Sequence, residues 1–194
     1  IGSITKSFTA SAIMRLVEQG KISLEDSGSK YLNFAPFSTH PDIKIKHMLS
    51  HSTGVPAADT GLFSLFYTFG DYRKIYPATT REDFEAHLGE PEDFIIYKPG
   101  KKFFYNNDIF TCLGFIIEQI SGLSYSEYIH NEILDLLGME RALFSKDKFE
   151  KDDDKMTGYL PHKEEDIMVP KKNDVPLYEY LSAGGGLYVS MEEM

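Results

Sequence analysis

Residues 2–10 read G-S-I-T-K-S-F-T-A and place a serine, Ser3, three residues before a lysine, Lys6, at the start of an amphipathic pattern. Apolar residues continue at helical spacing, which predicts a helix from Ser3 to about Gly20. On that helix both polar side chains share one face. A desolvated lysine can give up its proton and activate a serine hydroxyl as a nucleophile. The alternative is a capping serine followed by a solvated lysine. The apolar positions are Ile4, Phe8, Ala12, Ile13, Leu16 and Val17.

A second polar motif, Tyr105-Asn106-Asn107, follows the turn signal Lys98-Pro99-Gly100 and precedes another apolar repeat. That repeat predicts a helix over 108–121, ended by Gly122. Taken alone, Y-x-N at a helix start is also explained by a packed tyrosine ring and an asparagine N-cap.

In this order, and about a hundred residues apart, S-x-x-K and Y-x-N resemble the active site of the penicillin-recognising serine hydrolases. The branch they resemble contains the class C β-lactamases and the D-alanyl-D-alanine carboxypeptidases. Three further segments are similar to that branch: 47–56 (H-M-L-S-H-S-T-G-V-P), 137–139 (L-G-M, where the branch has a proline before the leucine) and 182–190 (S-A-G-G-G-L-Y-V-S).

The resemblance implies an α/β fold of the β-lactamase/transpeptidase type, in which a sheet from both chain ends packs against an inserted helical domain. The third motif of that family is a K-T-G or H-x-G triplet on a strand, and the resemblance puts it after Met194. We therefore expect an internal fragment, or a longer protein without its ends, with the strands of the terminal sheet largely missing. The expected parts are the nucleophile helix in 1–25, a mainly helical domain in 26–181 with a charged connection at 145–174, and a return segment in 182–194.

The resemblance also assigns roles within the site. Ser3 would attack the carbonyl of an amide or ester and form a covalent acyl-enzyme. Lys6 and Tyr105 would act as one hydrogen-bonded base system that titrates as a unit. Asn107 would bind the amide of the substrate and orient Lys6. The Ser3 N–H would supply one oxyanion donor, and the strand of the third motif would supply the other.

The reaction class is clearer than the substrate. The order of preference is a peptidase or amidase acting on a D-amino-acid-containing peptide, then a carboxylesterase, then a β-lactamase. A non-catalytic binding or scaffold member of the family is the alternative from a different class. A serine covalent mechanism needs no metal and no organic cofactor.

Composition limits the partners. The formal charge of −10 argues against nucleic acid or an anionic membrane, and leaves a small molecule or peptide as the expected partner. No apolar run approaches the roughly 20 residues that span a bilayer. Cys112, the single cysteine, falls in an apolar helix and is expected to be a buried, inert thiol. Oligomeric state stays open, as does location, with the cytoplasm slightly favoured over secretion or the periplasm.

Three other groups of residues could suggest a metal-binding or phosphate-binding site, but each has a simpler explanation. His47 and His51 are spaced like metal ligands on a helix, but no glutamate follows at zincin spacing, and the resemblance assigns them to a structural motif under the active site. The acidic run 152–154 lacks the glycine and distal glutamate of an EF-hand loop and is expected to be a solvated turn. Gly184 to Gly186 precede no G-K-[ST] and are expected to give a tight backbone path beside the active site.

The remaining expectations concern local structure. The sequence predicts an extended piece at 43–46, helical turns at 47–51, a lid or inserted helix in 57–78, capped helices at 81–88 and from Ser124 to Gly138, a surface connection with one hairpin in 145–174, and the start of a helix at 191–194.

Overall fold

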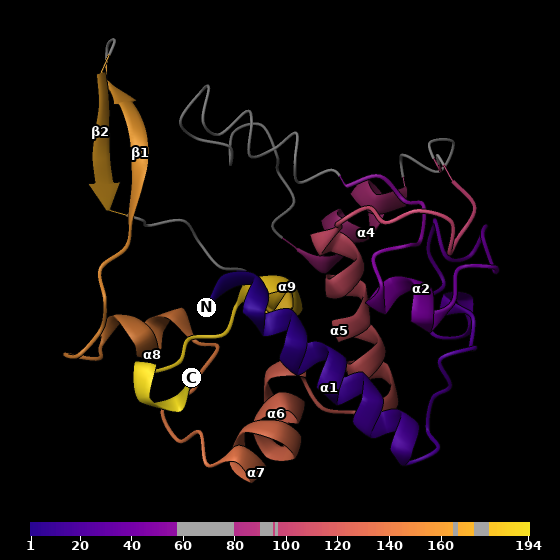
Figure 1. Ribbon diagram of the computed structural model, residues 1–194, viewed down its shortest axis with the longest axis horizontal. Helices are drawn as coiled ribbons and strands as arrows, with labels where there is room; N and C mark the ends of the chain where they lie inside the picture. The colour runs from indigo at the N-terminus through magenta and orange to yellow at the C-terminus, as the bar shows by residue number, and fades with distance from the viewer. Residues whose placement is uncertain (58–79, 90–94, 96, 165–166, 173–178) are drawn as a thin grey trace.

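The computed structural model describes residues 1–57, 80–89, 95, 97–164, 167–172 and 179–194. Its described part is helical except for one two-stranded sheet (Figure 1). The lid or inserted helix predicted in 57–78 falls, apart from Ala57, outside the described residues.

The helix predicted from Ser3 to about Gly20 is confirmed, with a tighter start. A 3₁₀ turn, Gly2–Ile4, leads into α1, Thr5–Glu18. Gly20 follows with φ of +69°, the left-handed conformation expected for the glycine that ends a helix. Ser3 therefore lies in the 3₁₀ turn and Lys6 in the first turn of α1.

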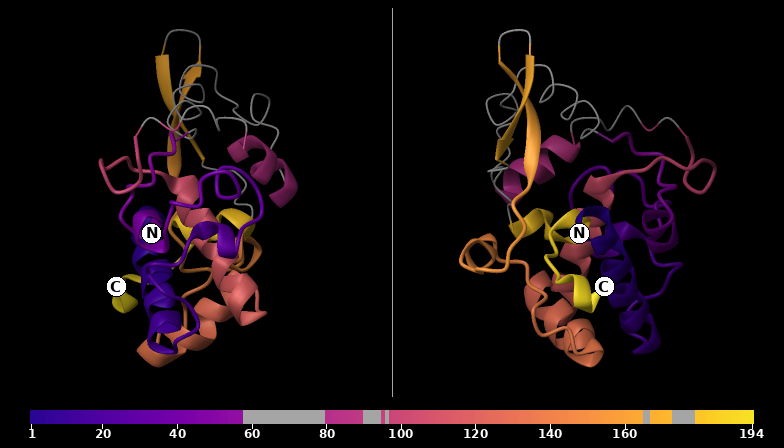
Figure 2. Two further views of the ribbon diagram at one scale, coloured as in Figure 1. Left: turned by 90° about the vertical axis from the view of Figure 1, so that its right-hand side faces the viewer. Right: turned by 60° about the vertical axis from the view of Figure 1, so that its left-hand side comes forward.

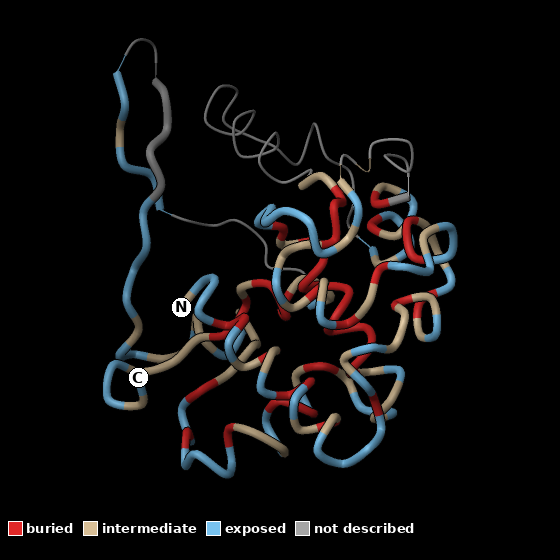
Figure 3. Tube along the Cα trace, turned by 45° about the vertical axis from the view of Figure 1, so that its right-hand side comes forward, coloured by how far each residue is buried: buried red, intermediate tan, exposed pale blue. Residues whose placement is uncertain are grey.

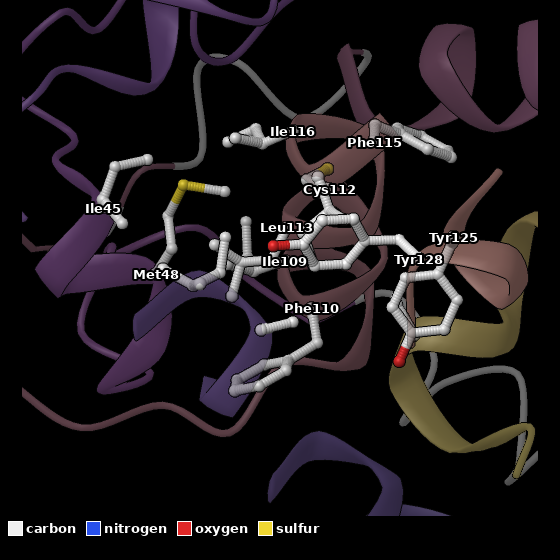
Figure 4. Packing of buried hydrophobic residues seen from close by; sticks show 14 of the residues in the cluster. Ile45, Met48, Ile109, Phe110, Cys112, Leu113, Phe115, Ile116, Tyr125 and Tyr128 are labelled. Atoms are coloured by element: carbon white, nitrogen blue, oxygen red, sulfur yellow. The ribbon is translucent and has the colours of Figure 1, made fainter. Parts of the chain in front are cut away.

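The long apolar helix is α5, Asn107–Ser121, and Gly122 ends it at φ of +73° as predicted. It runs through the centre of the molecule, and most of its side chains are buried. Cys112 lies in this interior among apolar neighbours (Figure 4), where burial raises the pKa of its thiol well above the ordinary value. The prediction of a buried cysteine is confirmed.

The helix predicted from Ser124 is confirmed, and so is its capping box: the Ser124 N–H donates to Glu127, and the Glu127 N–H donates back to the Ser124 hydroxyl. The helix is not uniform. It consists of α6, Tyr125–Ile129, a π-helical segment, His130–Leu134, and α7, Asp135–Leu137, and it ends at Gly138. The sequence gives no sign of the wider π turn.

The prediction of an extended piece at 43–46 is partly wrong. Lys44 is extended and bridges to Ser27, but α2, Ile45–Leu49, begins at the next residue. Ile45 and Met48 are both fully buried, and helical spacing brings both to one face. The box predicted before the next helix is correct: Thr80 and Asp83 cap α4, Arg81–Gly89.

Residues 145–174 contain the expected hairpin. They also contain a short helix that was not predicted, because the charged sequence has no apolar periodicity. The hairpin pairs β1, Tyr159–Glu164, antiparallel with β2, Ile167–Lys172, and it projects from the helices (Figure 2). The helix is α8, Lys146–Glu150, capped by the Ser145 hydroxyl. The acidic turn after it is held by Arg141, which pairs with Asp152 and Asp154 at 3.0 Å.

The C-terminal segment returns to the start of α1. A 3₁₀ turn, Glu179–Leu181, leads into α9, Ser182–Gly185, which packs against both α1 and α5. A last 3₁₀ turn, Met191–Glu193, stands where the start of a helix was predicted. The Leu187 N–H donates to the Thr5 hydroxyl at 3.2 Å, so the return segment is tied to α1.

Buried residues, red in Figure 3, form one core to which α1, α2, α4, α5, α6, α9 and the segment between α1 and α2 all contribute. Among the apolar positions predicted for the first helix, Ile13 and Leu16 of α1 are fully buried, whereas Ile4, in the preceding 3₁₀ turn, is 50% exposed.

Candidate active site

The hydroxyl of Ser3 lies between two groups brought from different elements. The Tyr105 hydroxyl donates to Ser3 Oγ at 2.6 Å, and Lys6 Nζ donates to the same oxygen at 3.3 Å. Ser3 is exposed and Tyr105 is 42% exposed, so both hydroxyls face solvent. The three residues predicted to share a site are therefore in mutual contact.

Lys6 is the buried member of this group, only 6% exposed. Besides Ser3, its ammonium donates to Asn107 Oδ1 at 2.5 Å and to the carbonyl of Gly184. An ammonium has three N–H donors, and here each has an acceptor. Lys6 Nζ also lies 5.0 Å from the centre of the Tyr105 ring, a cation–π distance.

The Y-x-N motif is held by the start of α5. Asn106, which is buried, is the N-cap, and its Oδ1 accepts from the Ile109 N–H at 3.2 Å. Its amide nitrogen donates to the carbonyls of Val55 and Pro56. This cap fixes the residues on either side of it, so that Tyr105 reaches Ser3 while Asn107 reaches Lys6.

The first glycines of the 184–186 run bring α9 beside the site, but space does not require a glycine at either position. A Cβ atom at Gly184 would lie 3.5 Å from the carbonyl oxygen of Asn107, and one at Gly185 would lie 3.6 Å from the backbone of Gly2, both ordinary van der Waals distances. Thr9 anchors the same segment from α1, donating to the carbonyl of Ala183 at 2.8 Å while contacting the Tyr125 hydroxyl at 2.8 Å. The Gly184 carbonyl that accepts from Lys6 is thus fixed by a buried network. Sequence reasoning assigned no role to Thr9 or Tyr125.

His51 lies directly behind Tyr105. The two ring centres are 4.5 Å apart with 33° between the planes. Burial, and secondarily the charge of Lys6, lowers the pKa of His51. His47 points elsewhere: its Nδ1 accepts from the Lys44 N–H at 3.2 Å and caps α2. No group of three potential metal ligands from His, Cys, Asp or Glu occurs in the part of the chain that the structure describes. Within that same part, no helix is both long and apolar enough to cross a membrane.

The chain belongs to the β-lactamase family, whose sequence model matches residues 1–194. Among solved structures, the octameric penicillin-binding protein homologue from Pyrococcus abyssi is 41% identical, with a TM-score of 0.82, over 100% of this chain and 42% of that one. The penicillin-binding protein from Bacillus halodurans is 32% identical, with a TM-score of 0.75, over 100% of this chain and 56% of that one. A class C β-lactamase, at 19% identity and a TM-score of 0.70 over 47% of its chain, shares the fold.

Among curated proteins, Protein flp of Staphylococcus aureus (strain NCTC 8325 / PS 47) is 30% identical over 152 residues, which make up 77% of this chain and 28% of that protein. Penicillin-binding protein 4* of Bacillus subtilis (strain 168) is 28% identical over 73% of this chain and 29% of its own length. The chain thus spans under a third of the curated relatives it matches. The β-lactamase/transpeptidase-like fold expected from the motifs is confirmed, and what is described here is mostly its helical part.

Proposed function

We propose that this chain carries the nucleophile and base of a serine hydrolase that cleaves an amide or ester through an acyl-enzyme on Ser3. The observation that supports it most is the contact of Ser3 Oγ with both the Tyr105 hydroxyl, at 2.6 Å, and Lys6 Nζ, at 3.3 Å. A nucleophile within hydrogen-bond reach of its base, with the base oriented by a third group, is the arrangement that activates a serine.

The proposed first step transfers the Ser3 proton to the Tyr105 oxygen as Oγ bonds to the carbonyl carbon. For this the tyrosine must be a phenolate when attack begins, and the Lys6 ammonium lies 5.0 Å from the centre of its ring. The protonated tyrosine then donates to the leaving nitrogen or oxygen as its bond to carbon breaks. Water, deprotonated by the same oxygen, hydrolyses the ester on Ser3. Asn107 holds Lys6 and binds the substrate amide.

The Ser3 N–H is proposed as one donor to the oxyanion, with a strand beyond Met194 supplying the second. A D-amino-acid-containing peptide is the favoured substrate, because the relatives at 41% and 32% identity are a penicillin-binding protein homologue and a penicillin-binding protein. A short acyl ester and a β-lactam are the alternatives on the same machinery. A family member that binds without turnover is the alternative from another class, and retention of the whole Ser3–Lys6–Tyr105–Asn107 cluster argues against it.

The test uses the full-length protein and a fluorophosphonate or a fluorescent penicillin. Mass spectrometry is expected to find the adduct on Ser3, and Ser3→Ala is expected to abolish labelling and lower kcat by roughly 10³-fold or more. Ser7→Ala is the matched control, since Ser7 lies one turn further along α1 and is exposed. An adduct on another serine, or full activity of Ser3→Ala, would reject the proposal.

A further inference from the structure

His51 is the one non-glycine residue of the described chain with a positive φ angle. Its φ is +52°, in the left-handed region that costs a side chain with a Cβ atom free energy. This conformation belongs to the end of α2: the His51 N–H donates to the Met48 carbonyl at 3.3 Å and the Ser52 N–H donates to the His47 carbonyl at 2.8 Å, the bonds of a helix C-cap with a left-handed residue. From this position His51 also makes three contacts with the segment around Tyr105.

Two of these contacts hold the backbone on either side of Tyr105. The Phe104 N–H donates to the His51 carbonyl at 2.7 Å, and the Asn106 N–H donates to His51 Nδ1 at 3.1 Å. The residue before the tyrosine and the residue after it are thus bonded to a single histidine. Left-handed backbone at His51 lets its carbonyl and its ring serve the same segment.

The third contact is with the tyrosine ring itself. The imidazole stacks on Tyr105 at 4.5 Å, packs against Phe110 at 4.8 Å with 34° between the planes, and meets the edge of Phe103 at 5.6 Å. Phe110 comes from α5, so the stack ties the tyrosine to the buried interior. An unsupported phenol with 42% exposure would sample several rotamers and leave Ser3.

We propose that His51 is a positioning residue that holds Tyr105 against Ser3, and that it does so only as the neutral imidazole with Nδ1 unprotonated. This inference rests on the proposed function, because it needs Tyr105 to be the base. It adds to the proposed site a residue, His51, that does not contact Ser3. It also gives a reason why the activity would fall at acid pH.

Protonation would remove the support in two ways. Nδ1 accepts a hydrogen bond from the Asn106 N–H. With a proton on Nδ1, two N–H groups would face each other and the hydrogen bond would be lost. It would also place a second positive charge beside the Lys6 ammonium. Among the described residues, the ionisable groups facing the imidazole are that ammonium, from α1, and the Tyr105 phenol; aromatic rings from Phe103 and Phe110 cover its other sides. Within the described part of the chain, no carboxylate contributes to the pKa of this imidazole, so none there stabilises an imidazolium.

The direction of the pH effect follows from the lowered pKa of His51. Neutral His51 is the form present above its ordinary pKa of 6.5, and the folded protein retains it to lower pH. The His51 clamp, meaning its contacts with Phe104, Tyr105 and Asn106, is therefore intact at pH 7 and above, and it is lost as the pH falls through the folded-state pKa, which lies below 6.5.

Three variants of the full-length protein separate the parts of the clamp. His51→Asn tolerates left-handed backbone and keeps an oxygen acceptor for the Asn106 N–H, but cannot titrate or stack. His51→Phe keeps the stack without the acceptor. His47→Asn is the matched control, because that histidine also caps a backbone N–H through Nδ1 yet faces away from Tyr105. Each protein is first checked for a cooperative thermal transition.

The readout is the rate of Ser3 labelling and kcat for a p-nitrophenyl ester between pH 4.5 and 8. The wild type is expected to lose activity in acid with one titrating group. His51→Asn is expected to lower kcat about 10²-fold, the cost of roughly 1 Å of misplacement, with KM little changed and the acid titration gone. His47→Asn is expected to keep the wild-type acid limb.

An unchanged acid limb and kcat in His51→Asn would overturn the inference while leaving the proposed function intact. Absence of wild-type Ser3 labelling would instead reject the proposed function. If both His51 variants fail to fold, nitrogen-15 NMR of the wild-type histidines decides: the inference requires Nδ1 of His51 to be unprotonated at pH 7 and to become protonated over the same range in which labelling slows. A His51 carrying its proton on Nδ1 at pH 7 would contradict it.

Discussion

Lys6 Nζ lies 2.5 Å from Oδ1 of Asn107, a residue 101 positions further along the chain. This bond joins the first turn of α1 to the first residue of α5, and the Gly184 carbonyl of α9 accepts from the same ammonium. Three helices that are far apart in the sequence thus meet at the same ammonium group. Lys6 therefore both holds the site together and supplies its positive charge.

The shared position of Lys6 and Tyr105 predicts that they act as one unit. Lys6→Ala and Tyr105→Phe are each expected to lower kcat by a similar factor, and the double variant by little more than the worse single one, because either change already disables the base. Rates of Ser3 acylation in the full-length proteins measure this. Strictly additive losses in the double variant would show that the two groups work independently.

Asn106 is predicted to matter for stability through the cap it forms. Asn106→Ala removes the acceptor for the Ile109 N–H and the donor for the Val55 and Pro56 carbonyls, and is expected to cost about 1–2 kcal/mol of unfolding free energy. Urea denaturation measures the loss.

Asn106→Asp separates the two halves of that role. It keeps the cap acceptor but sets a carboxylate against two carbonyls, so it is expected to destabilise the protein despite being a good N-cap residue. A stability equal to the wild type in Asn106→Asp would mean that the cap alone accounts for the effect.

The sequence predicts the local parts of this fold well because their signals are local. The boxes at Thr80 and Ser124 and the terminal glycines Gly20, Gly122 and Gly138 each fix a helix end with a few neighbouring residues. Predictions of short elements fail because few local residues carry a signal for them. At Ile45, burial against distant residues decides between strand and helix, and two alternating residues carry no such information.

In the candidate site too, local motifs identify some residues and miss those that act through distant contacts. Ser3, Lys6, Tyr105 and Asn107 are found from two short motifs, and the structure brings them together. Their supports are not found that way. His51 and Thr9 act through backbone groups of Phe104, Asn106 and Ala183, and almost any residue type at those positions would offer the same N–H or C=O, proline alone lacking the N–H.

Gly114 is predicted to be the residue that lets α9 rest on α5. A Cβ atom there would lie 2.7 Å from the Cβ of Ala183, closer than such atoms approach. Gly114→Ala is expected to cost about 1–3 kcal/mol, as overpacking does, and to displace the Gly184 carbonyl from Lys6. Thermal unfolding and the Ser3 labelling rate measure the two effects.

A compensating change makes the cause of this effect testable. Ala183→Gly removes the atom that a new Cβ would meet, so the double variant Gly114→Ala with Ala183→Gly is expected to regain part of the lost stability and labelling. Equal losses in the single and the double variant would exclude this contact as the reason for the glycine.

The last prediction concerns acid stability away from the site. The Asp26 carboxylate accepts from the Tyr31 hydroxyl at 2.5 Å, from the Ser23 N–H at 2.9 Å and from Lys30 Nζ at 2.9 Å, and these bonds lower its pKa from 3.8 to about 2. A lowered carboxylate pKa stabilises the folded state above the unfolded value near 3.8, and that contribution is lost as the pH falls toward 2. Asp26→Asn is therefore expected to cost about 1–2 kcal/mol at pH 6 and progressively less between pH 4 and pH 2. Urea midpoints across that range measure it, with Asp153→Asn, at an exposed position in the acidic turn, as the control. A difference between wild type and Asp26→Asn that stays constant down to pH 2 would show that the aspartate acts through packing and not through its charge.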